Sequence, residues 1–477
     1  MKMQKSTILA FVLFICFTSV KAQKKSAAIL EQLDQKSEQY GQIAQEIWNL
    51  AEMGYQEEKS SALLQKTLAD AGFTIKTGVA GIPTAFTAEY GSGSPIIGIM
   101  GEYDALPGLS QQAVSEKKSA GKAAGHACGH HLFGTASTAA AIATKDWLAA
   151  NKTEGTIRFY GTPAEEGGGA KVYMSREGLF DDVDVALHWH PGSQNAASAA
   201  AALSNISAKF RFYGVSAHAA GAPEKGRSSL DGIEAMNNMV NLMREHIPQE
   251  TRIHYVITDG GKAPNVVPDF AEVYYYARHN SRDVVKSIFD RIVKAAEGAA
   301  LGTGTTMDYE IVNGVHELLP NLTLQKVVHN NLSKVGGMEY TQEEKIFADQ
   351  IAVSLGQESA DLETAKNVQP YKETARAYGS TDVGDVSFVV PTVGFSTATW
   401  VPGTAAHSWQ AVAAGGTTIG NKGMMIAAKT LTLTAIDLFK NKDLISDAKK
   451  EFDERRGADF KYIPLLGDRA PALDYRN

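Results

Sequence analysis

The residues of this chain best suited to chemistry begin with a histidine-rich segment. Residues 125–131 read GHACGHH, so that His126, His130 and His131 crowd around Cys128. A thiolate is a soft metal ligand, imidazole binds the same ions, and the glycines let the backbone fold tightly around an ion. The segment therefore favours a transition-metal site, although a histidine-rich helix cap beside a buried cysteine fits the same pattern.

Two adjacent carboxylates follow an apolar run of strand length. Glu165 and Glu166 come just after residues 156–161, and three glycines follow them. An α/β sheet keeps its sites past the carboxyl ends of its strands, and neighbouring carboxylates repel each other unless a cation or a proton separates them. A division into one metal ligand and one general base fits this pair. A solvated acidic loop is the alternative.

Three further histidines also close apolar runs. His188 and His190 end the run 183–190, where strand alternation would point both side chains to the same side. His407 lies in a loop rich in glycine and alanine after the last expected strand. A single histidine is usually structural, but four loops that each follow a strand and carry His, Cys or Glu favour one shared metal site.

Hydrophobic periodicity predicts the elements that must position these residues. Helical spacing of apolar residues covers residues 26–50, and further helices are expected over 60–71, with Ser60 or Ser61 as its cap, and over 132–149. Apolar runs of strand length cover residues 85–90, 96–101, 156–161 and 183–190. Strands that alternate with helices predict an α/β domain with a largely parallel sheet.

The pattern changes near residue 203. Residues 203–315 read as strand, helix, two strands, helix and strand, which is the ferredoxin-like order of an open sheet with helices on one face. The α/β pattern then resumes, and the run 386–395 and a helix over 420–439 would complete the first domain. We therefore expect one domain made of residues 23–202 and 316–477, with residues 203–315 inserted into it.

Composition excludes several classes of protein. The chain is 44% hydrophobic and 21% charged, which excludes a mainly disordered protein. Its 46 basic and 53 acidic side chains give a net charge of −7, and this balance argues against a nucleic-acid partner.

Residues 1–22 have the features of a secretory signal peptide. Two lysines precede the apolar run 8–17, and small residues precede a cleavage site after Ala22. We expect export to the periplasm or the exterior; a membrane anchor is the alternative, although this run is too short to span a bilayer. No membrane association is expected after cleavage, and Cys128 then remains as the sole thiol.

Taken in order, several motifs resemble those of the dinuclear metallohydrolases of the aminoacylase and carboxypeptidase family. The resemblance extends from about residue 30 to 440 and is nearest to the amidohydrolase branch of hippurate, auxin-conjugate and p-aminobenzoyl-glutamate hydrolases. The motifs are GEYDALP at 101–107, ACGH at 127–130, PAEEG at 163–167, GVSAHAA at 214–220, and His407. The resemblance implies a zinc-peptidase-like catalytic domain with a mostly parallel sheet and an inserted ferredoxin-like domain that serves as a dimerisation lid.

The resemblance also implies a role for each motif residue. Cys128 would bridge two divalent ions, with zinc or manganese expected, and Glu165 would be the general base. Asp104 would be the acid that orients the ligands. The remaining metal ligands would be His130, Glu166, His190 and His407. His188 is the alternative to His190.

The inserted lid is expected to complete the active site of a homodimer. By resemblance, His218 would reach into the active site of the other chain of the dimer and stabilise the oxyanion. Asn265 and Arg278 would hold the substrate, and an arginine suits a carboxylate through paired hydrogen bonds. A second, related subunit is a further expected partner.

The expected reaction is hydrolysis of the amide bond of an N-acyl or N-aroyl amino acid, with p-aminobenzoyl-glutamate-like substrates favoured. Three alternatives stay open: a metallo-dipeptidase with the same site, a thiol hydrolase that uses Cys128 with His130 as base, and a periplasmic binding protein. The sequence departs from the family at Glu102, His131 and residues 380–383, which leaves the role of His131 open and puts the substrate pocket in doubt.

Overall fold

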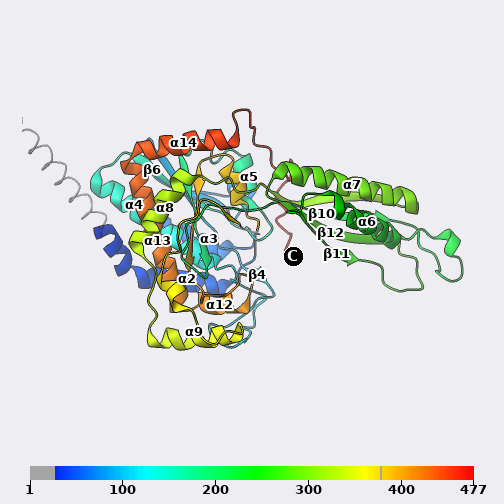
Figure 1. Cartoon of the computed structure of the whole chain (residues 1–477), viewed down its shortest axis with the longest axis horizontal. Coiled ribbons are helices and arrows are strands. Elements are labelled where there is room, and N and C mark those ends of the chain that lie inside the picture. Colours follow the sequence, from blue (N-terminus) through cyan, green and yellow to red (C-terminus); the bar gives the residue numbers. More distant parts are fainter. Residues whose placement is uncertain (1–26, 377–378, 477) are drawn as a thin grey trace, which may run out of the picture.

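The computed structural model describes residues 27–376 and 379–476. The signal-peptide prediction for residues 1–22 lies outside the described residues. Figure 1 shows a broad α/β body and a narrower arm, built of a sheet and two helices, that projects from it. Within the described ranges, no helix is long and apolar enough to cross a membrane.

The body is built around a six-stranded sheet with the order β1-β2-β6-β3-β7-β15. The four strands β6, β3, β7 and β15 are parallel, and β2 runs antiparallel to β6. This confirms the expected, mostly parallel sheet. The strands are β1 (Thr74–Thr77), β2 (Phe86–Ser92), β3 (Ile96–Gly101), β6 (Gly155–Gly161), β7 (Val185–Leu187) and β15 (Thr392–Val393).

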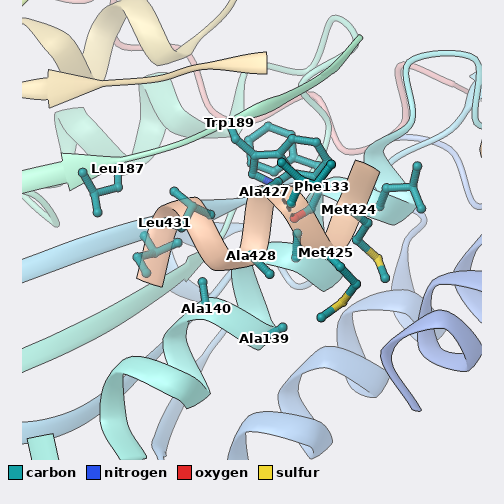
Figure 2. Close-up of a cluster of buried hydrophobic side chains, with 14 of the residues drawn as sticks. Phe133, Ala139, Ala140, Leu187, Trp189, Met424, Met425, Ala427, Ala428 and Leu431 are labelled. Atoms are coloured by element: carbon teal, nitrogen blue, oxygen red, sulfur yellow. Dashed lines mark hydrogen bonds between the residues drawn. The ribbon is translucent and has the colours of Figure 1, made fainter. Parts of the chain in front are cut away.

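Helices bury the sheet, and two of them, α4 (His130–Asn151) and α13 (Thr418–Lys440), pack against each other. Figure 2 shows their contact, where Ala139 and Ala140 lie near Ala428. Small side chains let the two helices approach closely, so the middle of α4 packs tightly against α13. The other helices of the body are α2 (Ser37–Leu50), α3 (Glu58–Asp70), α5 (Ala170–Arg176), α8 (Leu322–Val335), α9 (Gln342–Ser354), α10 (Leu362–Lys366), α11 (Val383–Ser387), α12 (Trp409–Gly415) and α14 (Lys442–Arg456).

The arm, which we call the lid, has the ferredoxin-like order that the sequence predicts. Its antiparallel sheet has the strand order β11-β12-β10-β13, and helices α6 and α7 pack on one face over a separate buried cluster that includes Phe210 and Val273. The elements are β10 (Ser204–Tyr213), α6 (Ser229–Met243), β11 (Arg252–Asp259), β12 (Phe270–His279), α7 (Arg282–Thr303) and β13 (Thr306–Val315).

Some local expectations were wrong. Neither Ser60 nor Ser61 caps α3; the Glu52 carboxylate accepts hydrogen bonds from the backbone N–H groups of Lys59 and Ser60, so a residue outside the helix satisfies its first turn. The Ser61 hydroxyl instead donates to the carbonyl of Thr84.

Two expected strands are also divided. The run 183–190 forms β7 and a second short strand, β8 (His190–Gly192), which pairs with β16 (Ser396–Ala398) rather than with the central sheet. The run 386–395 was expected to be one strand, but its first residues belong to the end of α11, and only Thr392–Val393 form a strand, β15. The expected helix over 26–50 is interrupted by a turn at Lys36.

Candidate metal centre and active site

A cavity of about 950 Å³ lies beside the carboxyl ends of the parallel strands, and the lid contributes part of its wall. Its size is in the range of small-molecule sites. The body supplies the predicted chemical groups Cys128, Glu165, Glu166, His190 and His407. From the lid sheet come Asn205, Tyr276, Arg278, Asn313 and Val315.

The predicted ligands form two groups of three that share one residue. Cys128, His130 and His190 are one group, and Cys128, Glu166 and His407 are the other; within each, the possible ligand atoms lie within 4.8 Å of one another. The Cys128 sulfur is 3.5 Å from His190 Nε2, and His407 Nε2 is 3.1 Å from Glu166 Oε1. These residues could hold two ions, with Cys128 as a possible ligand in both groups.

The donor atoms are of types that metal ions bind, and they are buried together. His130 Nε2 lies 3.1 Å from a Glu102 oxygen without a well-formed hydrogen bond to it, so no partner among the described residues satisfies this nitrogen fully. Burial raises the pKa of the Cys128 thiol, so a nearby cation is needed to make it a thiolate. Sulfur, imidazole and carboxylate donors together fit zinc, and they admit manganese.

Asp104 connects the two groups of ligands. One of its oxygens lies 2.8 Å from His130 Nδ1, and the other accepts the backbone N–H of Glu166 at 2.9 Å. Burial would lower the pKa of His130, but the charges of Asp104 and Glu102 raise it well above the usual range, so Nε2 would give up a proton when it binds an ion while Asp104 holds Nδ1. Burial alone would raise the pKa of Asp104, but His130, the backbone N–H of Glu166 and Lys171 together lower it, which favours a carboxylate anion between His130 and Glu166.

Glu165, the predicted general base, lies outside the two groups that contain Cys128, although it forms a third group of possible ligands with Glu102 and His130. It lines the cavity, and no hydrogen bond or ion pair to its side chain occurs among the described residues. Burial first, then the charges of Glu102 and Glu166, raises its pKa well above the usual range. A carboxyl group with a raised pKa that is not held by a partner can act as general base and then as general acid.

Sequence reasoning missed a buried lysine beside these groups. Lys171, at the start of α5, is fully buried, and its Nζ lies 2.7 Å from both Glu102 and Asp382. The second oxygen of Glu102 is 3.1 Å from His130 Nε2. The departures from the family pattern at 102 and 382 thus form one buried ion-pair network. No local motif marks Lys171, because its pairing depends on two distant segments.

The backbone around the ligands is folded unusually tightly. Ala164 and His407 have positive φ angles of 55° and 59°, which are uncommon for residues with a side chain. A Cβ atom at Gly168 would lie 2.6 Å from the Cβ of Ala164, so this turn requires a glycine. The glycines after Glu166 therefore serve to fold the carboxylate loop against its own start.

Comparisons with known proteins agree with this geometry. A family model described as a peptidase dimerisation domain (M20) matches residues 202–303. The chain is 41% identical over 462 residues to one of the subunits of p-aminobenzoyl-glutamate hydrolase from Escherichia coli (strain K12), covering 91% of this chain and 96% of that protein. It is 29% identical to the Xaa-Arg dipeptidase of Mus musculus, with coverage of 90% and 92%. The chain belongs to the M20 family.

A solved structure shows the same fold. It is a dinuclear metal binding peptidase of the M20 family from Bacillus subtilis, with a TM-score of 0.58, 16% identity, and coverage of 87% of this chain and 99% of that one. The family and the class of activity predicted from the motifs are confirmed, so this M20 member is a hydrolase of amide bonds.

Two histidines of this M20 chain lie near the ligands without joining them. His131 is buried, its Nε2 lies 3.0 Å from the carbonyl of Gly415, and its ring packs 4.9 Å from that of His126. These contacts indicate that His131 has a structural role. His188 lines the cavity, but it belongs to none of the groups of possible ligands found among the described residues, whereas His190 does.

The three predicted lid residues lie in two places. Arg278 lines the cavity of its own chain. His218 is exposed and does not line it, and neither does Asn265, whose carbonyl accepts the N–H of Ala219 at 3.0 Å. One chain alone therefore brings Arg278 to the site but leaves His218 and Asn265 outside it.

Proposed function

We propose that this hydrolase cleaves the amide bond of N-aroyl or N-acyl amino acids, with p-aminobenzoyl-glutamate and similar compounds as preferred substrates, and that it uses two divalent ions, zinc or manganese. The observation that carries the proposal is the pair of ligand groups that share Cys128 beside an unpaired Glu165. The 41% identity to a component of p-aminobenzoyl-glutamate hydrolase supports the substrate.

The residues divide the work of amide hydrolysis between them. Bound ions would supply Lewis-acid polarisation of the substrate carbonyl and lower the pKa of water. Glu165 accepts a proton from the attacking water and delivers it to the leaving amine. Asp104 keeps His130 and the Glu166 backbone in place while this happens. His218 of a second subunit would donate a hydrogen bond to the oxyanion.

A dipeptidase activity is the second candidate, and the similarity to the mouse Xaa-Arg dipeptidase favours it. The cavity argues for an anionic rather than a cationic amino-acid half. Its wall carries Arg278, Lys372 and Arg476, and none of these has an ion-pair partner among the described residues. A thiol hydrolase is disfavoured, because burial raises the pKa of Cys128.

The proposal includes a homodimer through the lid. The edge strand β11 exposes Tyr255, Val256 and Ile257, and apolar side chains on a free sheet edge favour pairing with another chain. A second, related subunit is also proposed, because the similar protein from Escherichia coli is named as one subunit of a hydrolase. Export to the periplasm or the exterior, with cleavage after Ala22, completes the proposal.

Metal analysis combined with an activity assay tests this proposal. We expect purified protein to hold about two ions per chain and to hydrolyse p-aminobenzoyl-glutamate faster than a dipeptide ending in arginine. Chelation should abolish turnover, and added zinc or manganese should restore it. Turnover that survives complete removal of the ions would contradict the mechanism, and preferred cleavage of the dipeptide would move the assignment to a dipeptidase.

A further inference from the structure

Residues 457–476, which follow α14, form a segment that we call the strap. It passes from α14 into the junction between the body and the lid, where the chain end is marked in Figure 1. The Tyr462 hydroxyl donates to Asp385 of α11 at 2.8 Å, and the Ile463 carbonyl lies 3.0 Å from the ring of His316, just after β13. Its first half is therefore fastened where the lid sheet joins the body.

The middle of the strap touches the body and the lid at the same time. Arg469 donates to the carbonyl of Val312 at 2.8 Å and pairs with Glu310 at 3.2 Å, both on β13. Arg176 of α5 donates to the carbonyl of Arg469 at 2.8 Å. These contacts on both sides fix the path of the residues that follow.

The end of the strap reaches the carboxylate loop of the active site. The Tyr475 hydroxyl and the Arg476 guanidinium both donate to the backbone carbonyl of Glu166, and the Tyr475 ring packs edge-on against Tyr55 at 5.5 Å. The Arg476 guanidinium lies over the Tyr475 ring at 4.7 Å, and Arg476 lines the cavity. A cation from a distant part of the sequence thus becomes part of the substrate site.

This cation has no anionic partner in the described chain. The Nε atoms of Arg476 and Arg278 are both buried without a hydrogen bond, and neither residue forms an ion pair with a described carboxylate. A buried N–H group without an acceptor is costly, and a carboxylate can bind two guanidinium N–H groups at once. Both arginines are therefore suited to an anionic ligand.

The two arginines line the same cavity. Arg278 lies 5.3 Å over the ring of Tyr276, whose hydroxyl is 3.2 Å from that of Tyr274. Tyr276, Arg278 and Arg476 all contribute to the cavity wall, Tyr276 and Arg278 from the lid and Arg476 from the strap.

We propose that Arg476 is a specificity-determining residue that binds the side-chain carboxylate of a dicarboxylic amino-acid half, while Arg278 binds the α-carboxylate. This inference rests on the proposed amide hydrolysis of N-acyl amino acids. It adds to that function a preference for substrates with two carboxylates, and it assigns this preference to a residue delivered by the strap.

The test compares two substrates that differ in one charge. The kinetics and the calorimetric binding of p-aminobenzoyl-glutamate and p-aminobenzoyl-glutamine are measured for the full-length enzyme and for Arg476→Ala, Arg476→Lys and the lid-surface control Arg291→Ala. We expect Arg476→Ala to raise the KM and Kd for the glutamate compound roughly 10- to 100-fold, with kcat within about 2-fold. The glutamine compound should be almost unaffected, Arg476→Lys should be intermediate, and Arg291→Ala should match the wild type.

The outcomes separate this inference from the proposed function. Equal losses for both compounds, or no loss for either, would overturn the role of Arg476. If the wild type binds the glutamate compound without hydrolysing it, the proposed function fails, and the ratio of the two Kd values still decides the role of Arg476. If thermal unfolding shows that Arg476→Ala loosens the strap, Arg476→Lys decides: unless it retains a preference for the glutamate compound, the inference is wrong.

Discussion

The metal-ligand cluster of the body and the outer loops of the lid differ in how their functional side chains are supported. In the body, His130 is buried and contacts both Asp104 and Glu102. In the lid, His218 is exposed, and its Nδ1 accepts hydrogen bonds only from the backbone N–H groups of Ala220 and Gly221. The possible metal ligands of the first region come together within one chain, whereas His218 does not line the active-site cavity of its own chain.

This difference indicates a division between chemistry and assembly. Groups that must hold ions need fixed neighbours, since metal affinity depends on the contacts behind each ligand. A residue that must enter the cavity of another chain has to stay exposed until that chain binds. If this view is right, changes in the cluster act within one chain, and changes in the lid loops act across two chains.

The largest effect is expected at Glu165. Glu165→Gln keeps the size of the side chain but removes its ability to take a proton, so kcat should fall by roughly 10³-fold while bound metal and the thermal unfolding temperature stay unchanged. Steady-state kinetics and elemental analysis check this, with the exposed Glu177→Gln as a matched control. A loss of less than about 10-fold would show that another group is the base.

The next largest effect is on metal content, which should differ between variants of Cys128 and of His407. Because Cys128 belongs to both ligand groups and His407 to one, Cys128→Ala should lose both ions and His407→Ala about one ion per chain. Metal content after gel filtration measures this, and His254→Ala on the exposed strand β11 is the control. Retention of two ions by Cys128→Ala would contradict the role of Cys128 as a ligand shared by both ions.

The same contrast explains what the sequence could and could not predict. The cluster residues follow strands and lie in short motifs, so spacing indicated the segment around Cys128 and the pair Glu165 and Glu166, and the family resemblance implied which of these residues are ligands. Lys171 and Arg476 carry no motif, because a buried or cavity-facing cation is defined by segments far away in the chain. Local rules also failed at α3, where Glu52 replaces the expected serine cap.

The lid elements were predictable for a different reason. Their strands alternate and their helices show clear periodicity, so the ferredoxin-like order from β10 to β13 followed from pattern alone. A role for His218 at an active site could not be tested in one chain, because His218 contacts only neighbouring lid residues in the described part of the chain and does not line the cavity of its own chain. Pattern therefore predicts the scaffold better than it predicts which residues meet at the site.

Complementation between chains tests whether His218 acts across the dimer. Glu165→Gln and His218→Ala chains should each be nearly inactive, but equal mixtures that are unfolded and refolded together should recover about a quarter of the wild-type rate, since half the dimers have one intact site of two. Activity of co-refolded mixtures is compared with that of each variant alone. A mixture no more active than the average of the two variants would place His218 in the site of its own chain and remove the contrast between the regions.

The smallest effect concerns the joint between body and lid, where Asp385 accepts hydrogen bonds from the Tyr462 hydroxyl of the strap and the backbone N–H of His316. Burial raises the pKa of Asp385 to about 8, whereas the unfolded chain releases this proton near a pKa of about 4. Between these values the folded state binds more protons than the unfolded state, so the free energy of unfolding should fall as pH rises, by at most about 1.4 kcal/mol per pH unit.

The variant Asp385→Asn should flatten this slope, and the control Asp447→Asn, at an exposed position of α14, should not. Urea unfolding between about pH 5 and 8 measures the slopes. An equal slope in the wild type and both variants would mean that the Asp385 carboxyl stays ionised in the folded protein and holds the strap as a charged group.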